Sequence, residues 1–92
     1  MLLKHKTAII TGCNRGIGKS ILKIFSENGA NIIACVREAS PEFQNIVKEI
    51  EKKNKNRIFV ENFDFNNEKE SKDAGARINL KNKKIDILIN NA

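Results

Sequence analysis

The chain has 92 residues and a mass of 10.4 kDa, which allows one small domain or part of a larger one and excludes a second domain. Its 40% hydrophobic content is ordinary for a globular protein, and no apolar run approaches the roughly 20 residues that span a bilayer. The net charge of +6 would suit a polyanion, but the basic residues are interspersed with acidic residues and asparagines, as on solvated surfaces. We therefore expect a folded cytoplasmic chain that binds neither membrane nor nucleic acid.

The residues that most often carry catalysis are scarce. There is no tyrosine or tryptophan, and His5 is the single histidine. Cys13 and Cys35 are too few for a disulfide framework, and their spacing matches no metal or redox motif. We expect both cysteines to be reduced packing residues, and we expect no metal site.

The first half of the chain predicts a strand, a helix and a second strand. Residues 7–11 form a short apolar run rich in β-branched residues that stops at Gly12, as a buried parallel strand does. An amphipathic helix follows and ends near Asn28, with Gly29 as a left-handed cap. Its apolar positions recur at helical spacing: Ile17, Ile21, Ile24 and Phe25. Residues 31–36 are a second continuous apolar run, which predicts a strand covered on both faces.

The second half repeats this alternation. Ser40 offers an N-cap oxygen and Pro41 takes the first helical position, which predicts a helix that fades around residue 54. Residues 57–63 and 85–90 predict two further strands, and residues 64–67 a polar turn. Between them, residues 68–82 predict a weakly periodic helix. The expected core contacts of the two helices are Phe43, Ile46, Val47 and Ile50, then Ala74, Ile78 and Leu80.

Strands that alternate with helices predict an α/β fold. Because crossovers between parallel strands are right-handed, the strands should form one parallel sheet with helices on both faces. The expected fold is the first half of a Rossmann-like doubly wound sheet, β-α-β-α-β-α-β, with strand order 3-2-1-4.

The loop after the first predicted strand reads T-G-x-x-x-G-x-G from Thr11 to Gly18. Gly12 allows a tight turn, Gly16 lets the backbone approach a ligand, and Gly18 lets the following helix pack close to the sheet. A pyrophosphate would then meet the free N–H groups and positive dipole of that helix. Because the motif follows a predicted strand and opens a predicted helix, it indicates a dinucleotide site and not simply a turn.

The end of the second predicted strand indicates which dinucleotide is bound. NAD-binding folds commonly carry an acidic residue there, whereas this chain has Arg37 after Val36. Arg37 could pair with a 2′-phosphate, and Arg15 could reach the same phosphate from the glycine loop. The sequence therefore favours NADP over NAD. Glu38, one residue further on, keeps NAD open as the less favoured cofactor.

Three motifs resemble the short-chain dehydrogenase/reductase family, and within it the 3-oxoacyl-[acyl-carrier-protein] reductases. They are the glycine loop, Asp64 followed by Phe65 after the third strand, and residues 86–92, whose sequence D-I-L-I-N-N-A is similar to the family's D-x-L-x-N-N-A-G. Their order and spacing agree over the whole chain.

The resemblance implies a set of cofactor-binding residues. Asp64 and Phe65 would border the adenine. Asn91 would contact the ribose on the nicotinamide side, and Arg37 would hold the 2′-phosphate. The residues that would line the diphosphate and ribose are Gly12, Asn14, Arg15, Gly16, Ile17 and Gly18.

The same resemblance implies hydride transfer between a nicotinamide and a carbonyl compound, carried out with the family's catalytic Ser, Tyr and Lys, whose positions come after residue 92 in the family's order. We therefore expect residues 1–92 to be the truncated N-terminal NADP-binding portion of one Rossmann-fold domain. The intact protein would be an NADP-dependent carbonyl reductase and a homo-oligomer, while this chain alone, without tyrosine, would be inactive. The alternatives are a stand-alone dinucleotide-binding remnant without activity and, least favoured, a basic nucleic-acid binder.

Overall fold

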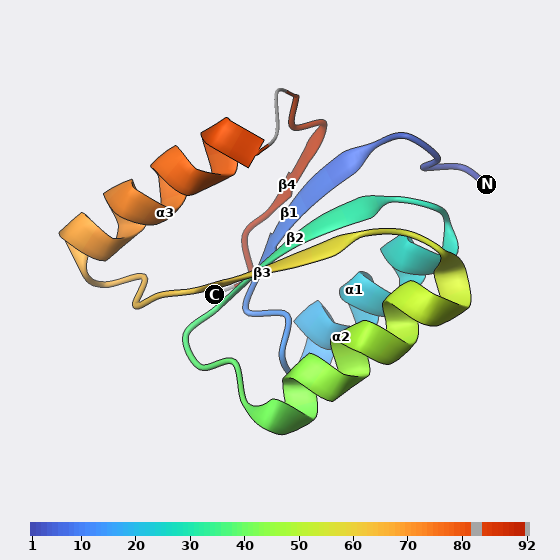
Figure 1. Ribbon diagram of the computed structural model, residues 1–92, viewed down its shortest axis with the longest axis horizontal. Coiled ribbons are helices and arrows are strands. Elements are labelled where there is room, and N and C mark those ends of the chain that lie inside the picture. The colour runs from blue at the N-terminus through green and yellow to red at the C-terminus, as the bar shows by residue number, and fades with distance from the viewer. Residues whose placement is uncertain (82–83, 92) are drawn as a thin grey trace.

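The computed structural model describes residues 1–81 and 84–91, and strands and helices alternate along them (Figure 1). This succession confirms the predicted one. Residue 82, expected to end the third helix, and Ala92, the last residue of the third motif, lie outside the described residues. The elements are β1 (Thr7–Thr11), α1 (Gly16–Glu27), β2 (Asn31–Val36), α2 (Pro41–Asn54), β3 (Ile58–Asn62), α3 (Glu68–Lys81) and β4 (Ile87–Ile89).

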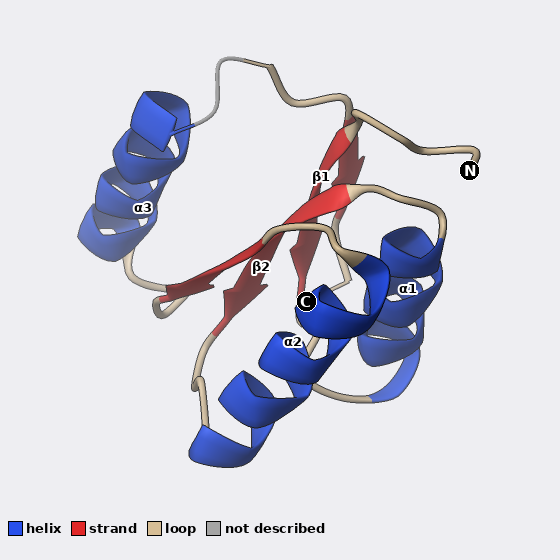
Figure 2. Cartoon of the chain, turned by 45° about the vertical axis from the view of Figure 1, so that its right-hand side comes forward, coloured by secondary structure: helices blue, strands red, loops and turns tan. Residues whose placement is uncertain are grey.

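The four strands form one parallel sheet in the order β3-β2-β1-β4, which confirms the predicted topology. In this register Ile9 of β1 lies opposite Ile33 of β2 and Leu88 of β4. Helices α1 and α2 cover one face of the sheet and α3 covers the other (Figures 1 and 2). Because all the strands run the same way, the loops that follow them meet at one edge.

The core has a layer on each face of the sheet, because β2 is buried on both sides. Cys13 belongs to the larger layer beneath α1 and α2, and Cys35 to the smaller one beneath α3. Both thiols are free. Burial raises the pKa of Cys13 to about 12 and that of Cys35 to about 11, so both stay protonated near neutral pH. They are reduced packing residues, as predicted.

The helix ends agree with the predicted caps. Helix α1 stops at Glu27, and Gly29 follows with a φ of 91°. Helix α2 begins at Pro41, where the Ser40 hydroxyl accepts a hydrogen bond of 3.1 Å from the Phe43 N–H. Its expected core contacts Phe43, Val47 and Ile50 are buried, and Ile46 is half-buried.

Two of the apolar positions that predicted α1, and the expected core contact Leu80 of α3, lie at the surface. Ile17 and Ile24 of α1 are 72% and 54% exposed, because the face that meets the sheet is formed by Gly18, Leu22 and Ser26. Helix α1 has isoleucines on more than one face, so periodicity alone could not identify the inner one. Leu80 of α3 is 87% exposed, because Ala74 and Ile78 are four residues apart and define an inward face that a residue two positions later does not share.

The outer strands are shorter than predicted. β4 spans Ile87–Ile89 instead of 85–90. Just before it, Asp86 is bonded to the start of β1. The Asp86 carboxylate accepts a 3.0 Å hydrogen bond from the Thr7 N–H, and the Asp86 N–H donates to the Thr7 carbonyl at 2.9 Å. The bond from Thr7 and the nearby Lys84 ammonium hold the Asp86 pKa below its usual range. β3 is one residue shorter at each end than the predicted 57–63.

An ion pair between a buried carboxylate and a half-exposed guanidinium joins α3 to the sheet. The Glu61 side chain points from β3 to the α3 side and is only 5% exposed as a residue. Its Oε1 accepts a hydrogen bond of 2.9 Å from Arg77 Nε, and Arg77 Nη2 lies 2.9 Å from the same oxygen. This hydrogen bond raises the pKa of Arg77, so the guanidinium stays charged. The buried residues of α3 are Ala74 and Ile78, so the ion pair adds to a small apolar contact.

We predict that Arg77→Met lowers the free energy of unfolding by about 1–2 kcal/mol at pH 7, because it removes the hydrogen-bond donor of the buried Glu61 carboxylate, while the half-exposed position of Arg77 lets water replace part of the loss. Glu61→Leu combined with Arg77→Met should recover most of that loss, since the double variant buries no charge. Urea unfolding followed by far-UV circular dichroism measures both. Equal losses in the single and double variants would contradict the prediction.

Candidate functional site

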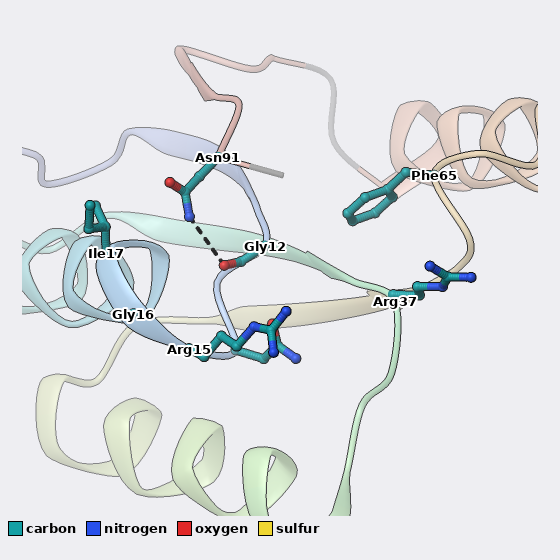
Figure 3. A pocket seen from close by; sticks show the side chains of 8 residues that line it. Gly12, Arg15, Gly16, Ile17, Arg37, Phe65 and Asn91 are labelled. Atoms are coloured by element: carbon teal, nitrogen blue, oxygen red, sulfur yellow. Dashed lines mark hydrogen bonds between the residues drawn. The ribbon is translucent and has the colours of Figure 1, made fainter.

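A cavity of about 600 Å³ opens at the edge where the strands end (Figure 3). It lies where strand order reverses, since β2 and β4 leave β1 on opposite sides, and ligands of doubly wound sheets bind at such points. Every residue that lines it was singled out from the sequence. They are Gly12, Asn14, Arg15, Gly16, Ile17, Arg37, Phe65 and Asn91.

The three glycines of the loop serve different purposes. Gly12 and Gly16 have φ values of 62° and 58°, a left-handed conformation that costs other residues strain. No atom lies within 4 Å of where a Gly16 Cβ would stand, so this backbone faces open space beside the cavity. Gly18 is buried, and a Cβ there would come within 2.3 Å of the Gly12 carbonyl oxygen and 2.6 Å of Asn91 Nδ2. Gly18 therefore lies behind the cavity wall, and its lack of a side chain lets α1 pack closely against Gly12 and Asn91.

The start of α1 is left open to a ligand. Its N-cap Arg15 has extended backbone and makes no side-chain capping bond, and the first turn contains no acidic residue. Helix α2 differs, because Ser40 caps it and Glu42 lies in its first turn. Free N–H groups and the positive end of the α1 dipole thus face the cavity, where they favour an anion.

Two guanidinium groups lie on the wall of the cavity. Arg15 belongs to the glycine loop, and Arg37 follows β2. Asp64 does not line the cavity itself but forms an ion pair with Arg37, which does. Its Oδ2 lies 3.7 Å from Arg37 Nη2. Phe65 lines the wall on the α3 side and packs edge-on against Phe63 with ring centroids 4.9 Å apart. Of the ten predicted site residues, eight thus line the cavity, Gly18 lies behind its wall, and Asp64 contacts one of the lining residues, Arg37.

Asn91 connects the end of β4 to the glycine loop. Its Nδ2 donates to the Gly12 carbonyl at 3.3 Å, and its backbone N–H donates to the Thr11 hydroxyl at 2.9 Å. The Thr11 hydroxyl oxygen is also 3.2 Å from Asn90 Oδ1. The sequence did not indicate this role for Thr11, although a hydroxyl at the last position of an apolar strand is a signal that could have found it.

Within residues 1–81 and 84–91, no cluster of three or more His, Cys, Asp or Glu side chains could hold a metal ion. In the same part of the chain, no helix is both long enough and apolar enough to cross a membrane. What the site offers is backbone N–H groups, a helix dipole and two cations around an open cavity. Together with the parallel sheet in the order β3-β2-β1-β4, these are the features of the first half of a doubly wound α/β protein, with an opening that favours an anion.

Comparison with known proteins identifies the family. The model of the short-chain dehydrogenase family matches residues 6–92, so the chain belongs to that family of oxidoreductases.

Individual relatives match all or part of the chain and are themselves much longer. 2-Dehydro-3-deoxy-D-gluconate 5-dehydrogenase of Bacillus subtilis is 38% identical over 98% of this chain and 34% of its own length. 3-Oxoacyl-[acyl-carrier-protein] reductase of Chlamydia trachomatis is 64% identical over 34% of this chain and 12% of its own. L-Sorbose reductase of Gluconobacter frateurii, solved with NADPH and L-sorbose, superposes with a TM-score of 0.87 and 26% identity over all of this chain and 35% of its own. The chain thus spans about a third of the first of these relatives.

Three glycine-to-alanine variants should separate the role of Gly18 from that of Gly16 in the glycine loop, with Gly75 outside the loop as the control. Gly18→Ala should lower the free energy of unfolding by roughly 2–3 kcal/mol, because backbone and Asn91 must move away from the new methyl group. Gly16→Ala should cost about 1–2 kcal/mol, from conformational strain alone. Gly75→Ala in α3 is the matched control and should stabilise by up to about 1 kcal/mol, since its site is open and helical.

Chemical denaturation of the three variants beside the parent chain tests this order. A Gly18→Ala variant as stable as the parent would contradict the close approach that the structure shows.

Proposed function

We propose that residues 1–92 are the NADP-binding N-terminal portion of an oxidoreductase that reduces a small-molecule carbonyl compound. The observation that carries the choice of NADP is the pair of guanidinium groups on the cavity wall, Arg15 and Arg37. No acidic residue ends β2, where one would repel a 2′-phosphate; Arg37 stands there, and Glu38 is exposed in the loop beyond it.

The geometry of the cavity fits a dinucleotide. The open backbone at Gly16 and the uncapped start of α1 would receive the pyrophosphate. Arg37 would pair with the 2′-phosphate, and Phe65 would border the adenine. Asn91, already bonded to Gly12, would contact the ribose on the nicotinamide side.

The chain holds the cofactor but does not itself supply the acid for carbonyl reduction. The nicotinamide would supply the hydride. A proton donor such as the family's tyrosine must come from elsewhere, because this chain contains no tyrosine. The reductase activity, the carbonyl substrate and the homo-oligomer therefore belong to our proposal for a longer protein. The similarity to L-sorbose reductase, solved with NADPH, supports the proposal.

Removing the Arg37 charge should weaken NADPH binding about tenfold and leave NADH binding nearly unchanged, because the two cofactors differ only in the 2′-phosphate. The variant is Arg37→Gln, and Arg57→Gln, at the opposite end of the sheet, is the matched control. Isothermal titration of each variant with both cofactors gives the two affinities. An equal loss for NADH and NADPH would argue against a 2′-phosphate contact.

Activity is tested on the native protein from its source. A native mass of about 25–30 kDa, as expected for both halves of a doubly wound domain, with NADPH oxidation in the presence of carbonyl compounds, would support the reductase. A native mass of 10.4 kDa with NADPH binding but no oxidation would support the stand-alone remnant instead.

A further inference from the structure

Arg37 already has an anionic partner within the protein. Its Nη2 lies 3.7 Å from Oδ2 of Asp64, in the loop after β3. We propose that Asp64 competes with the 2′-phosphate of the dinucleotide for Arg37 and thereby limits how strongly the chain prefers NADP over NAD. The proposal rests on the proposed function, since it assumes that Arg37 receives the 2′-phosphate.

Asp64 is the fixed member of the pair. Its Oδ1 accepts a hydrogen bond of 2.9 Å from the Asn66 N–H, and its own N–H donates to Glu70 Oε1 at 3.2 Å. These bonds leave Oδ2 as the oxygen that faces Arg37. The Arg37 side chain is 68% exposed against 34% for Asp64. Arg37 is thus the member that can move, and its position depends on whichever anion lies closest.

The pair draws Arg37 away from the rest of the site. In Figure 3 the Arg37 side chain extends away from Arg15 and toward the loop between β3 and α3. Arg15, on the other side of the cavity, forms no ion pair with any described residue. Arg15 is therefore available to an anionic ligand at once, whereas Arg37 must first leave the Asp64 carboxylate.

This arrangement affects the two cofactors differently. NAD has no 2′-phosphate, so it can bind while Arg37 stays with Asp64. NADP must take Arg37 from Asp64, and the free energy of the internal pair is subtracted from its binding. Because the pair is exposed, it is weak and lowers the preference for the 2′-phosphate by only a small factor. Asp64 thus lowers the preference for NADP over NAD without blocking the binding of either cofactor.

The test uses the full chain and two probes that differ only in the 2′-phosphate, adenosine 2′,5′-bisphosphate and 5′-AMP. NMR titration of the ¹⁵N-labelled chain gives the dissociation constant of each, even where binding is weak. Asp64→Asn keeps the acceptor for Asn66 and removes the charge. We expect it to raise the preference for the bisphosphate over 5′-AMP about three- to fivefold.

The matched control is Asp73→Asn, which removes the same charge from an exposed pair with Lys69 on α3 and should leave the preference unchanged. Asp64→Asn is also made in the Arg37→Gln background, where the gain should disappear because there is no guanidinium to compete for. A gain that persists there would mean direct repulsion of the phosphate by Asp64 and would overturn the proposal.

A preference that falls or stays constant in Asp64→Asn overturns the proposal as well. The proposed function fails separately, if Arg37→Gln alone leaves the preference of the parent chain unchanged.

Discussion

The site depends on one close approach, between the first turn of α1 and the loop that precedes it. At Gly18 there is no room for even one carbon atom beyond the backbone, because the Gly12 carbonyl and the Asn91 amide lie where it would stand. This contact brings the open end of the helix against the sheet edge. It also makes the helix N-terminus part of the cavity wall instead of a surface feature. The same turn places Gly12 and Gly16 in the left-handed conformation.

β1 is the element around which this edge is arranged. It pairs with β2 on one side and, on the other, with β4 from the far end of the described chain, and the Thr11 hydroxyl at its end accepts a hydrogen bond from the Asn91 N–H. Residues about 80 positions apart in the sequence therefore meet beside the glycine loop. The cavity lies at this junction because parallel strands all end on the same side, and only there do loops diverge to leave space.

Much of the fold could be predicted, because the information is local. Continuous apolar runs, Ser40 with Pro41, and Gly29 identified strands and helix ends within a few residues. What could not be predicted depends on which face of an element meets another. Ile17 and Ile24 are apolar but face outward. Likewise, the site residues were recognisable by type and order, whereas the Asp64–Arg37 and Glu61–Arg77 pairs join residues far apart in sequence whose orientation no local pattern specifies.

The two ion pairs illustrate how burial decides what a charge does. Glu61 is almost fully buried, so its carboxylate depends on the hydrogen bond from Arg77. The pair therefore helps to hold α3 against the sheet. Arg37 and Asp64 are partly exposed, so water can replace either partner and the pair adds little stability. If Arg37 receives the 2′-phosphate as we propose, that weakness suits the pair to a binding site. A strongly buried pair beside the cavity would keep Arg37 from any ligand, whereas an exposed pair would yield to a doubly charged phosphate while still lowering its affinity.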